Sequence, residues 1–141
     1  GIPVLGKLLP LLGAIVIPDG IHDMLKFREA LKFYGDKHPI IIYPEAHVWP
    51  YYTKIRPFKN SAFQLAIEEK KEVYSATTTY KKSKIFKKPK IVVYVDGPFY
   101  VDNFLTKKEK SNTLAKIVRD KMIERSKMSN VEYVIYKKKD N

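Results

Sequence analysis

Short apolar runs alternate along the chain with segments of helical periodicity. β-Branched residues dominate at 14–17, 39–43 and 91–95, and Gly or Pro flanks each run, so each predicts a buried strand. A segment at 73–80 that is rich in Thr, Tyr and Val predicts another strand. The pattern at 131–136 is compatible with a last strand before a lysine-rich tail.

A first helix is expected between the strands at 14–17 and 39–43. Asp19 or Gly20 can cap its start, it runs to about Tyr34, and Gly35 is a suitable stop. Its apolar positions recur at the spacing of one helix face. They are Ile21, Met24, Leu25, Leu31 and Tyr34.

Two further helices begin with capping-box patterns. Ser61 with Gln64 precedes a short helix at 62–69, and Thr106 with Glu109 opens a longer one that runs to about residue 127. The longer helix has apolar residues on one face, which we expect to point inward. These are Leu114, Ile117, Val118 and Met122.

Buried strands that alternate with amphipathic helices predict an α/β fold. We expect a single domain over residues 1–141, with a mostly parallel central sheet flanked by helices. Ligands of such sheets bind beyond the carboxyl ends of the strands. The loop that follows the strand at 39–43 is therefore the expected functional site.

Composition narrows the possible partners. The formal net charge is +12, and most of the basic excess lies after residue 60, so the surface should attract an anionic partner such as lipid head groups, nucleic acid or an acidic protein. The densest stretch has six lysines and no acidic residue, and we expect it to help hold the domain on an anionic lipid surface. A solubilising loop with no partner is the alternative interpretation. The lysines of this stretch are Lys81, Lys82, Lys84, Lys87, Lys88 and Lys90.

The sequence does not indicate a metal-binding, disulfide-linked or membrane-spanning protein. There is no cysteine, and His22, His38 and His47 are too scattered for a zinc pattern, so neither a metal nor a cofactor is expected. The apolar stretch at 8–17 is too short to span a bilayer and is interrupted by Pro and Gly. The default location is therefore cytoplasmic, with peripheral association at the inner face of the cell membrane.

The loop after residue 43 concentrates the candidate chemistry. Glu45 follows an expected strand directly, so its position should be well fixed. Four basic side chains follow it closely, and they form either a structural ion pair with Glu45 or an anion site that holds a phosphate. They are His47, Lys54, Arg56 and Lys59. Trp49, Tyr51 and Tyr52 lie in the same loop, as core residues or as the lining of an acyl or head-group surface.

The sequence Ile42-Tyr43-Pro44-Glu45, followed after a loop by Pro57-Phe58-Lys59-Asn60-Ser61-Ala62-Phe63, resembles the third motif of the glycerolipid acyltransferases. These enzymes include the 1-acyl-sn-glycerol-3-phosphate acyltransferases. The segment 2–19 resembles the second motif of the family, and the strand at 73–80 has the place of its fourth. The first motif, His-x-x-x-x-Asp, is not present. The resemblance therefore implies an acyltransferase-like α/β domain, represented by a carboxyl-terminal portion without the catalytic dyad.

The resemblance also assigns roles to the loop. In the family this loop binds the acceptor phosphate, and the glutamate orders it, a role that Glu45 matches; Lys59 matches the family lysine. Val48 occupies the place of the family arginine, so we expect Lys54 and Arg56 to supply cationic contacts instead. His47 stands where the family has threonine and can donate a hydrogen bond.

The function implied is acyl transfer in glycerophospholipid synthesis. A fatty acyl group passes from acyl-CoA or acyl-carrier protein to 1-acyl-glycerol-3-phosphate or a similar lysophospholipid. This chain alone is expected to be inactive because the general base is missing. Two alternatives stay open, a basic nucleic-acid-binding module and an inactive scaffold domain at a membrane surface. Of these partners, nucleic acid is the one not expected, because the chain has no helix-turn-helix, zinc-finger or aromatic RNA-binding signature.

Overall fold

A computed structural model describes residues 21–45 and 49–137. The expected strand and second-motif segment within 2–19 lie outside these residues. The chain divides into two compact units, Gly1–Ile42 and Tyr43–Asn141, and each is described by itself.

The first unit contains helix α2 (Ile21–Gly35), whose end at Gly35 agrees with the stop expected there. Leu31 is buried, whereas Leu25 and Tyr34 are exposed, so the predicted apolar stripe is only partly covered.

No strand forms at 39–43. A β-branched run becomes a strand only when another strand pairs with it, and none of the described segments does so here. Ile41 is consequently 79% exposed. The loop that follows is therefore not at the carboxyl end of a strand.

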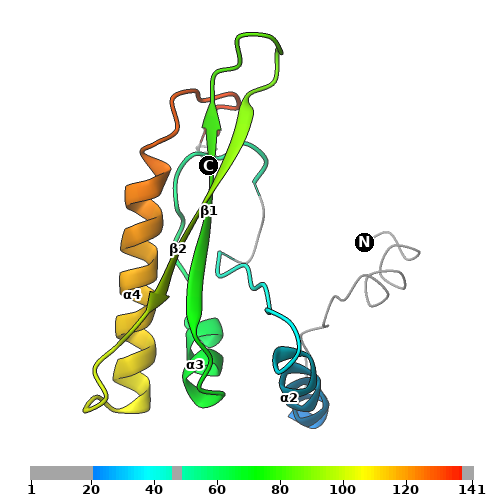
Figure 1. The fold of residues 1–141 in the computed structure, drawn as a ribbon, viewed down its shortest axis with the longest axis vertical. Helices are drawn as coiled ribbons and strands as arrows, with labels where there is room; N and C mark the ends of the chain where they lie inside the picture. Colours follow the sequence, from blue (N-terminus) through cyan, green and yellow to red (C-terminus); the bar gives the residue numbers. More distant parts are fainter. Residues whose placement is uncertain (1–20, 46–48, 138–141) are drawn as a thin grey trace. The chain divides into compact units, whose positions relative to one another are not determined.

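The second unit is built on an antiparallel hairpin of β1 (Val73–Lys81) and β2 (Lys90–Phe99), shown in green in Figure 1. Helices α3 (Ser61–Glu68) and α4 (Lys107–Ser126) accompany it. The prediction of a mostly parallel sheet flanked by helices is wrong. Parallel strands need a crossover of about a dozen or more residues, and the connection between β1 and β2 is shorter. Residues 131–136 form no strand.

The register of the hairpin depends on Gly97. The strand predicted at 91–95 is longer in the structure, because β2 continues through Gly97 and Pro98 to Phe99, opposite Val73. The pairing shifts between Val73 and Ser75, where Gly97 has φ of 130°. A Cβ at Gly97 would lie 2.9 Å from the Val73 carbonyl oxygen, so another residue would collide with β1 here.

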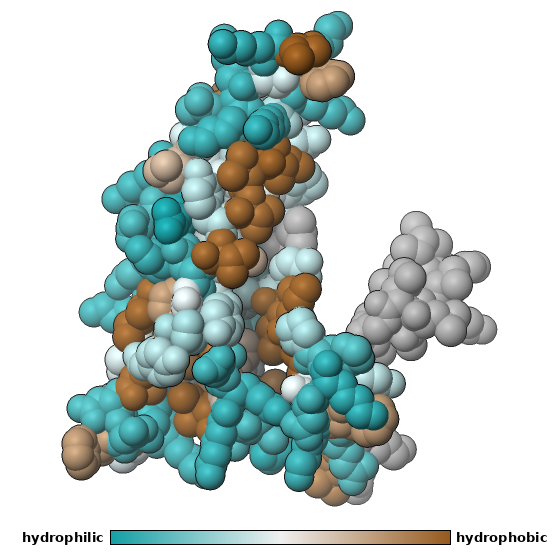
Figure 2. Space-filling view, viewed as in Figure 1, coloured by the Kyte–Doolittle hydropathy of each residue, from teal (hydrophilic) through white to brown (hydrophobic). Residues whose placement is uncertain are grey.

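Helix α4 covers one face of the hairpin. The residues of β1 on that face are polar, and Ser75, Thr77 and Thr79 are all buried. The Thr79 hydroxyl donates to the Val92 carbonyl oxygen at 3.0 Å. The open face carries the more apolar side chains, and Figure 2 shows hydrophobic residues gathered along it. The exposed apolar residues of β2 on this face are Ile91, Val93 and Val95.

The hydrophobic core lies between α3, α4 and the hairpin. Phe63 of α3 packs with Leu114 and Val118 of α4, and each is at most 4% exposed. Partly buried apolar residues surround these three, namely Phe58, Ala62, Ile67, Val73, Phe99, Val101, Ala115 and Met122. Ile117 was expected to point inward but is 37% exposed, because it lies beside the covered face and not on it.

The two predicted capping boxes have different outcomes. The Thr106–Glu109 box is confirmed, with both reciprocal hydrogen bonds present at the start of α4. The Ser61–Gln64 box is wrong, because Asn60 is the N-cap of α3 and makes no side-chain cap. The Asn60 amide instead donates to the Ser111 hydroxyl at 3.2 Å, so it joins α3 to α4.

An ion pair fastens the end of α4 to β2. Arg125 donates from Nη2 to Asp96 Oδ1 at 2.6 Å and from Nε to Oδ2 at 2.9 Å. The guanidinium also lies over the Tyr94 ring, 5.0 Å from its centroid. The hydrogen bonds from Arg125 lower the pKa of Asp96. This bidentate contact fixes the helix at the end opposite its capping box.

We expect Leu114→Ala to lower the free energy of unfolding by about 2–5 kcal/mol, because it leaves a cavity in the core. Urea unfolding followed by circular dichroism measures the change. Ile117→Ala on the same helix is the control and should cost clearly less, since Ile117 is partly exposed. Equal losses would show that Leu114 is not a core residue.

We expect Asp96→Asn to be less stable than the wild type at pH 7. The folded-state pKa of Asp96 is lowered, so its contribution is present above the unfolded pKa of about 4 and disappears as the pH falls through the folded value. Melting temperatures from pH 7 to pH 2 should therefore converge at low pH. The exposed Asp120 supplies the control Asp120→Asn. A pH-independent difference would contradict this account.

Candidate functional site

Glu45 and Arg56 hold the two ends of a loop together. The Glu45 Oε2 atom accepts from the Arg56 backbone N at 2.9 Å and from Nε at 3.3 Å, and Arg56 Nη2 donates to the Glu45 carbonyl oxygen at 3.1 Å. The two side chains are 22% and 17% exposed. The ion pair expected for Glu45 is therefore present, with Arg56 as its partner.

A second contact closes the same loop. The Lys59 backbone N donates to the Pro44 carbonyl oxygen at 3.0 Å. Residues 44–59, called here the Glu45 loop, thus begin and end at one place. Phe58 stacks on Phe63 with ring centroids 5.8 Å apart, which attaches the closed end of the loop to the core.

The aromatic residues of the loop pack against distant parts of the same unit. Trp49 stacks on Tyr136 at 5.0 Å between centroids, and Tyr51 meets Tyr133 at 4.8 Å. The Tyr136 hydroxyl donates to the Pro50 carbonyl oxygen at 2.8 Å. The ring contacts form two groups, Trp49 with Tyr52 and Tyr136, and Tyr51 with Tyr80 and Tyr133, and the six residues are called here the aromatic cluster.

The aromatic cluster contacts the ion pair through Arg56. The Arg56 guanidinium lies over the Trp49 ring, 4.7 Å from its centroid. Tyr51 has a positive φ of 62°, a costly conformation for a bulky side chain, and its contacts with Tyr80 and Tyr133 hold it there. Of the three predicted lining residues, Trp49 and Tyr52 are in ring contact at 5.1 Å between centroids, whereas Tyr51 contacts Tyr80 and Tyr133 instead. Trp49 keeps 41% of its surface exposed, and a lining role for the three stays a prediction.

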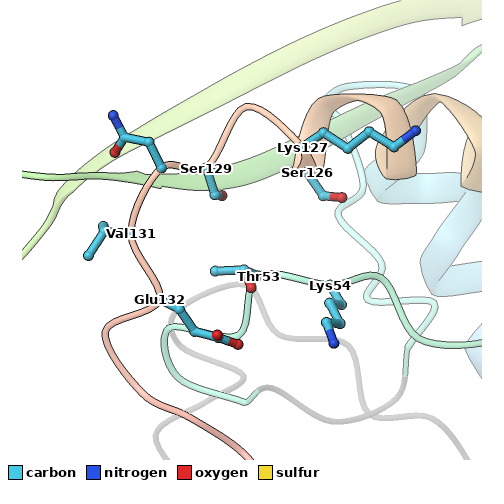
Figure 3. A pocket seen from close by; sticks show the side chains of 8 residues that line it. Thr53, Lys54, Ser126, Lys127, Ser129, Val131 and Glu132 are labelled. Atoms are coloured by element: carbon cyan, nitrogen blue, oxygen red, sulfur yellow. The ribbon is translucent and has the colours of Figure 1, made fainter.

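The remaining predicted cations are separated. Lys59 is exposed at the closure of the Glu45 loop. Lys54 is also exposed, but it lines an open pocket of about 510 Å³ that the segment after α4 completes. Figure 3 shows the ammonium groups of Lys54 and Lys127 pointing in different directions, with the Glu132 carboxylate nearby. This pocket does not gather its cations around one point. His47 lies outside the described residues.

Arg119 was not among the site residues predicted from the sequence. This residue of α4 donates from Nε to the Arg56 carbonyl oxygen at 3.3 Å, so it brings another cation to the Glu45 loop. Two ring partners of the loop were also not predicted, Tyr133 for Tyr51 and Tyr136 for Trp49. No short-range pattern connects these residues, because the contacts join segments far apart in sequence.

The segment after α4 also covers the edge of β1. Tyr80 N donates to the Ser129 hydroxyl at 3.2 Å, and Asn130 N donates to the Tyr80 carbonyl oxygen at 3.0 Å. The Lys81 ammonium donates to the Met128 carbonyl oxygen. Burial in these surroundings raises the pKa of Tyr80. Lys81 is therefore occupied within the protein, unlike the other five lysines of its stretch, which are exposed.

Within the described parts of the chain, no group of His, Asp or Glu side chains is arranged to hold a metal ion. Across 21–45 and 49–137, no helix combines the length and apolarity that crossing a bilayer requires. Comparisons with protein-family models, curated proteins and solved structures find no match.

We expect Glu45→Gln to loosen the Glu45 loop, because one carboxylate oxygen accepts two of its hydrogen bonds. Trp49 is the single tryptophan and stacks against Arg56, so its emission maximum should shift to longer wavelength as it becomes more solvated. The free energy of unfolding should fall by about 1–2 kcal/mol. Glu132→Gln, which changes an exposed carboxylate nearby, should leave the spectrum unaltered. An unshifted spectrum in Glu45→Gln would contradict the role of the ion pair.

Proposed function

We propose that this chain is the acceptor-binding part of a glycerolipid acyltransferase. Its ligand would be the phosphate of 1-acyl-glycerol-3-phosphate or a similar lysophospholipid, at the inner face of an anionic cell membrane. The acyl donor of the complete reaction would be acyl-CoA or acyl-carrier protein. The observation that carries the proposal is the closure of the Glu45 loop by the Glu45–Arg56 ion pair and the Pro44–Lys59 hydrogen bond.

The closure agrees with the role that the acyltransferase resemblance gives to Glu45. The carboxylate faces Arg56, so its work is to order the loop and not to contact a phosphate, which it would repel. Arg56 is oriented by the same contacts and by Trp49. The two motif residues Pro44 and Lys59 are joined at the closure by their backbone hydrogen bond.

Lys59 is the best-placed phosphate ligand of the loop. Its backbone is fixed by the bond to Pro44, and its side chain is exposed. Arg119 of α4 contacts the loop through a hydrogen bond to the Arg56 carbonyl oxygen. Cationic side chains on fixed backbone can bind a phosphate by charge-assisted hydrogen bonds. Lys54 lies at a separate pocket, so its part in binding is the less direct one.

Binding and not turnover is the property to measure. Acyl transfer to a hydroxyl requires a base that removes its proton, and such a base contributes about 10²–10⁴-fold. The family places this base in a His-x-x-x-x-Asp motif, which the sequence does not contain. The net charge of +12 favours anionic surfaces and ligands independently of catalysis.

We expect the chain to bind a short-chain lysophosphatidic acid, used below its micellar concentration, more tightly than the matching monoacylglycerol. Isothermal titration calorimetry measures both. Lys59→Gln should weaken the binding of lysophosphatidic acid by about tenfold, since a hydrogen bond to a charged group is lost. Lys107→Gln removes an exposed lysine in the first turn of α4 and serves as the matched control.

Equal affinity for the two lipids would contradict the proposal, as would equal weakening by Lys59→Gln and Lys107→Gln. Lys54→Gln distinguishes phosphate binding at Lys59 from phosphate binding in the pocket of Figure 3. If Lys54→Gln weakens binding and Lys59→Gln does not, the phosphate binds in that pocket and the assignment of Lys59 is wrong.

A further inference from the structure

The loop that joins β1 and β2 exposes two large apolar side chains. Residues 82–89, called here the hairpin tip, extend beyond the paired strands at the top of Figure 1. Ile85 is 86% exposed and Phe86 is 73% exposed. The two residues are adjacent in sequence and lie at the end of the hairpin, where none of the described helices covers them.

The backbone of the hairpin tip is ordered locally. The Ser83 hydroxyl oxygen accepts from the Ile85 backbone N at 3.3 Å and from the Phe86 backbone N at 2.9 Å. These bonds satisfy the two amides within the loop itself. The backbone N–H groups of Ile85 and Phe86 therefore need no further hydrogen-bond partner when the two side chains enter an apolar environment.

Basic charge surrounds the apolar pair. Five lysines of the hairpin are exposed, and no acidic residue lies between Lys81 and Lys90. They are Lys82, Lys84, Lys87, Lys88 and Lys90. Lys81 does not belong to this set because Met128 binds its ammonium group. The hairpin tip thus combines two exposed apolar side chains with exposed lysines on both sides of them in the sequence.

We propose that the hairpin tip inserts Ile85 and Phe86 into the interfacial region of an anionic bilayer. The lysines would remain at the level of the head groups, because a long alkyl stem lets the ammonium reach water and phosphate while its own carbon atoms stay near the lipid. Charge brings the tip to the surface, and burial of the two apolar side chains adds a contribution that salt does not screen.

A bilayer fits these side chains better than a nucleic acid does. Single-stranded nucleic acid is bound by aromatic rings on which bases stack, and Phe86 is the only aromatic residue of the tip. Ile85, the more exposed of the pair, cannot stack on a base. A lipid interface accommodates both side chains together with the lysines.

The inference refines the membrane location in the proposed function but rests on residues outside the Glu45 loop. The two tests can therefore fail separately. Phosphate binding is measured with soluble ligand, and insertion is measured with vesicles.

The experiment is vesicle co-sedimentation of the full chain with phosphatidylcholine vesicles that contain phosphatidylglycerol. We expect the double variant Ile85→Ser, Phe86→Ser, which keeps every charge, to bind about tenfold more weakly. The triple variant Lys84→Gln, Lys87→Gln, Lys88→Gln should bind about a hundredfold more weakly at low salt. Phe104→Ser removes an exposed apolar side chain at the other end of β2 and should bind like the wild type.

A spectroscopic measurement distinguishes insertion from adhesion. In a Phe86→Trp variant, the added indole should shift to shorter wavelength with vesicles and should be quenched by lipids brominated on their acyl chains. Wild-type binding by the serine double variant would overturn the proposal. So would an unquenched indole, or binding of a single-stranded oligonucleotide through Phe86 with no binding to vesicles.

Discussion

A two-stranded hairpin cannot bury enough surface to be stable alone, and the second unit depends on how α4 supplies the missing layer. Leu114 and Val118 close one side of the hairpin, and Asp96 holds the far end of the helix. Phe63 joins α3 to this layer, and Phe58 attaches the Glu45 loop to Phe63. The position of the candidate site is therefore set by the same packing that stabilises the hairpin.

Local signals in the sequence identified several elements correctly. Thr106 and Glu109 mark the start of α4, and the patterns at 73–80 and 91–95 mark the two strands. Strand direction was not predictable in this way. The continuous apolar run at 91–95 is typical of a parallel strand buried on both faces. In the structure its alternate residues Ile91 and Val93 are more than half exposed, since only one face of the hairpin is covered.

The candidate site was predictable only in its local part. Glu45 and Arg56 are near in sequence, so their opposite charges alone indicate a possible pair. Arg119 reaches the same loop from 63 residues away, and nothing near it in sequence indicates this partner. The isoleucines before Glu45 also suggested a strand that does not form. The predicted ion pair of Glu45 is nevertheless present, because both of its partners lie within the loop and do not depend on the segment that precedes it.

The aromatic cluster has a consequence for the order of folding. The hydrogen bond from Tyr136 to Pro50 spans 86 residues, so the contacts of Tyr136 close a long loop of chain. Closing such a loop costs conformational entropy before its contacts repay it, whereas the β1–β2 hairpin and its helix form through nearer neighbours. Tyr133 and Tyr136 should accordingly dock after the hairpin has formed. Trp49 and the segment 129–136 would then open first in the native state, while Leu114 and Val118 stay packed.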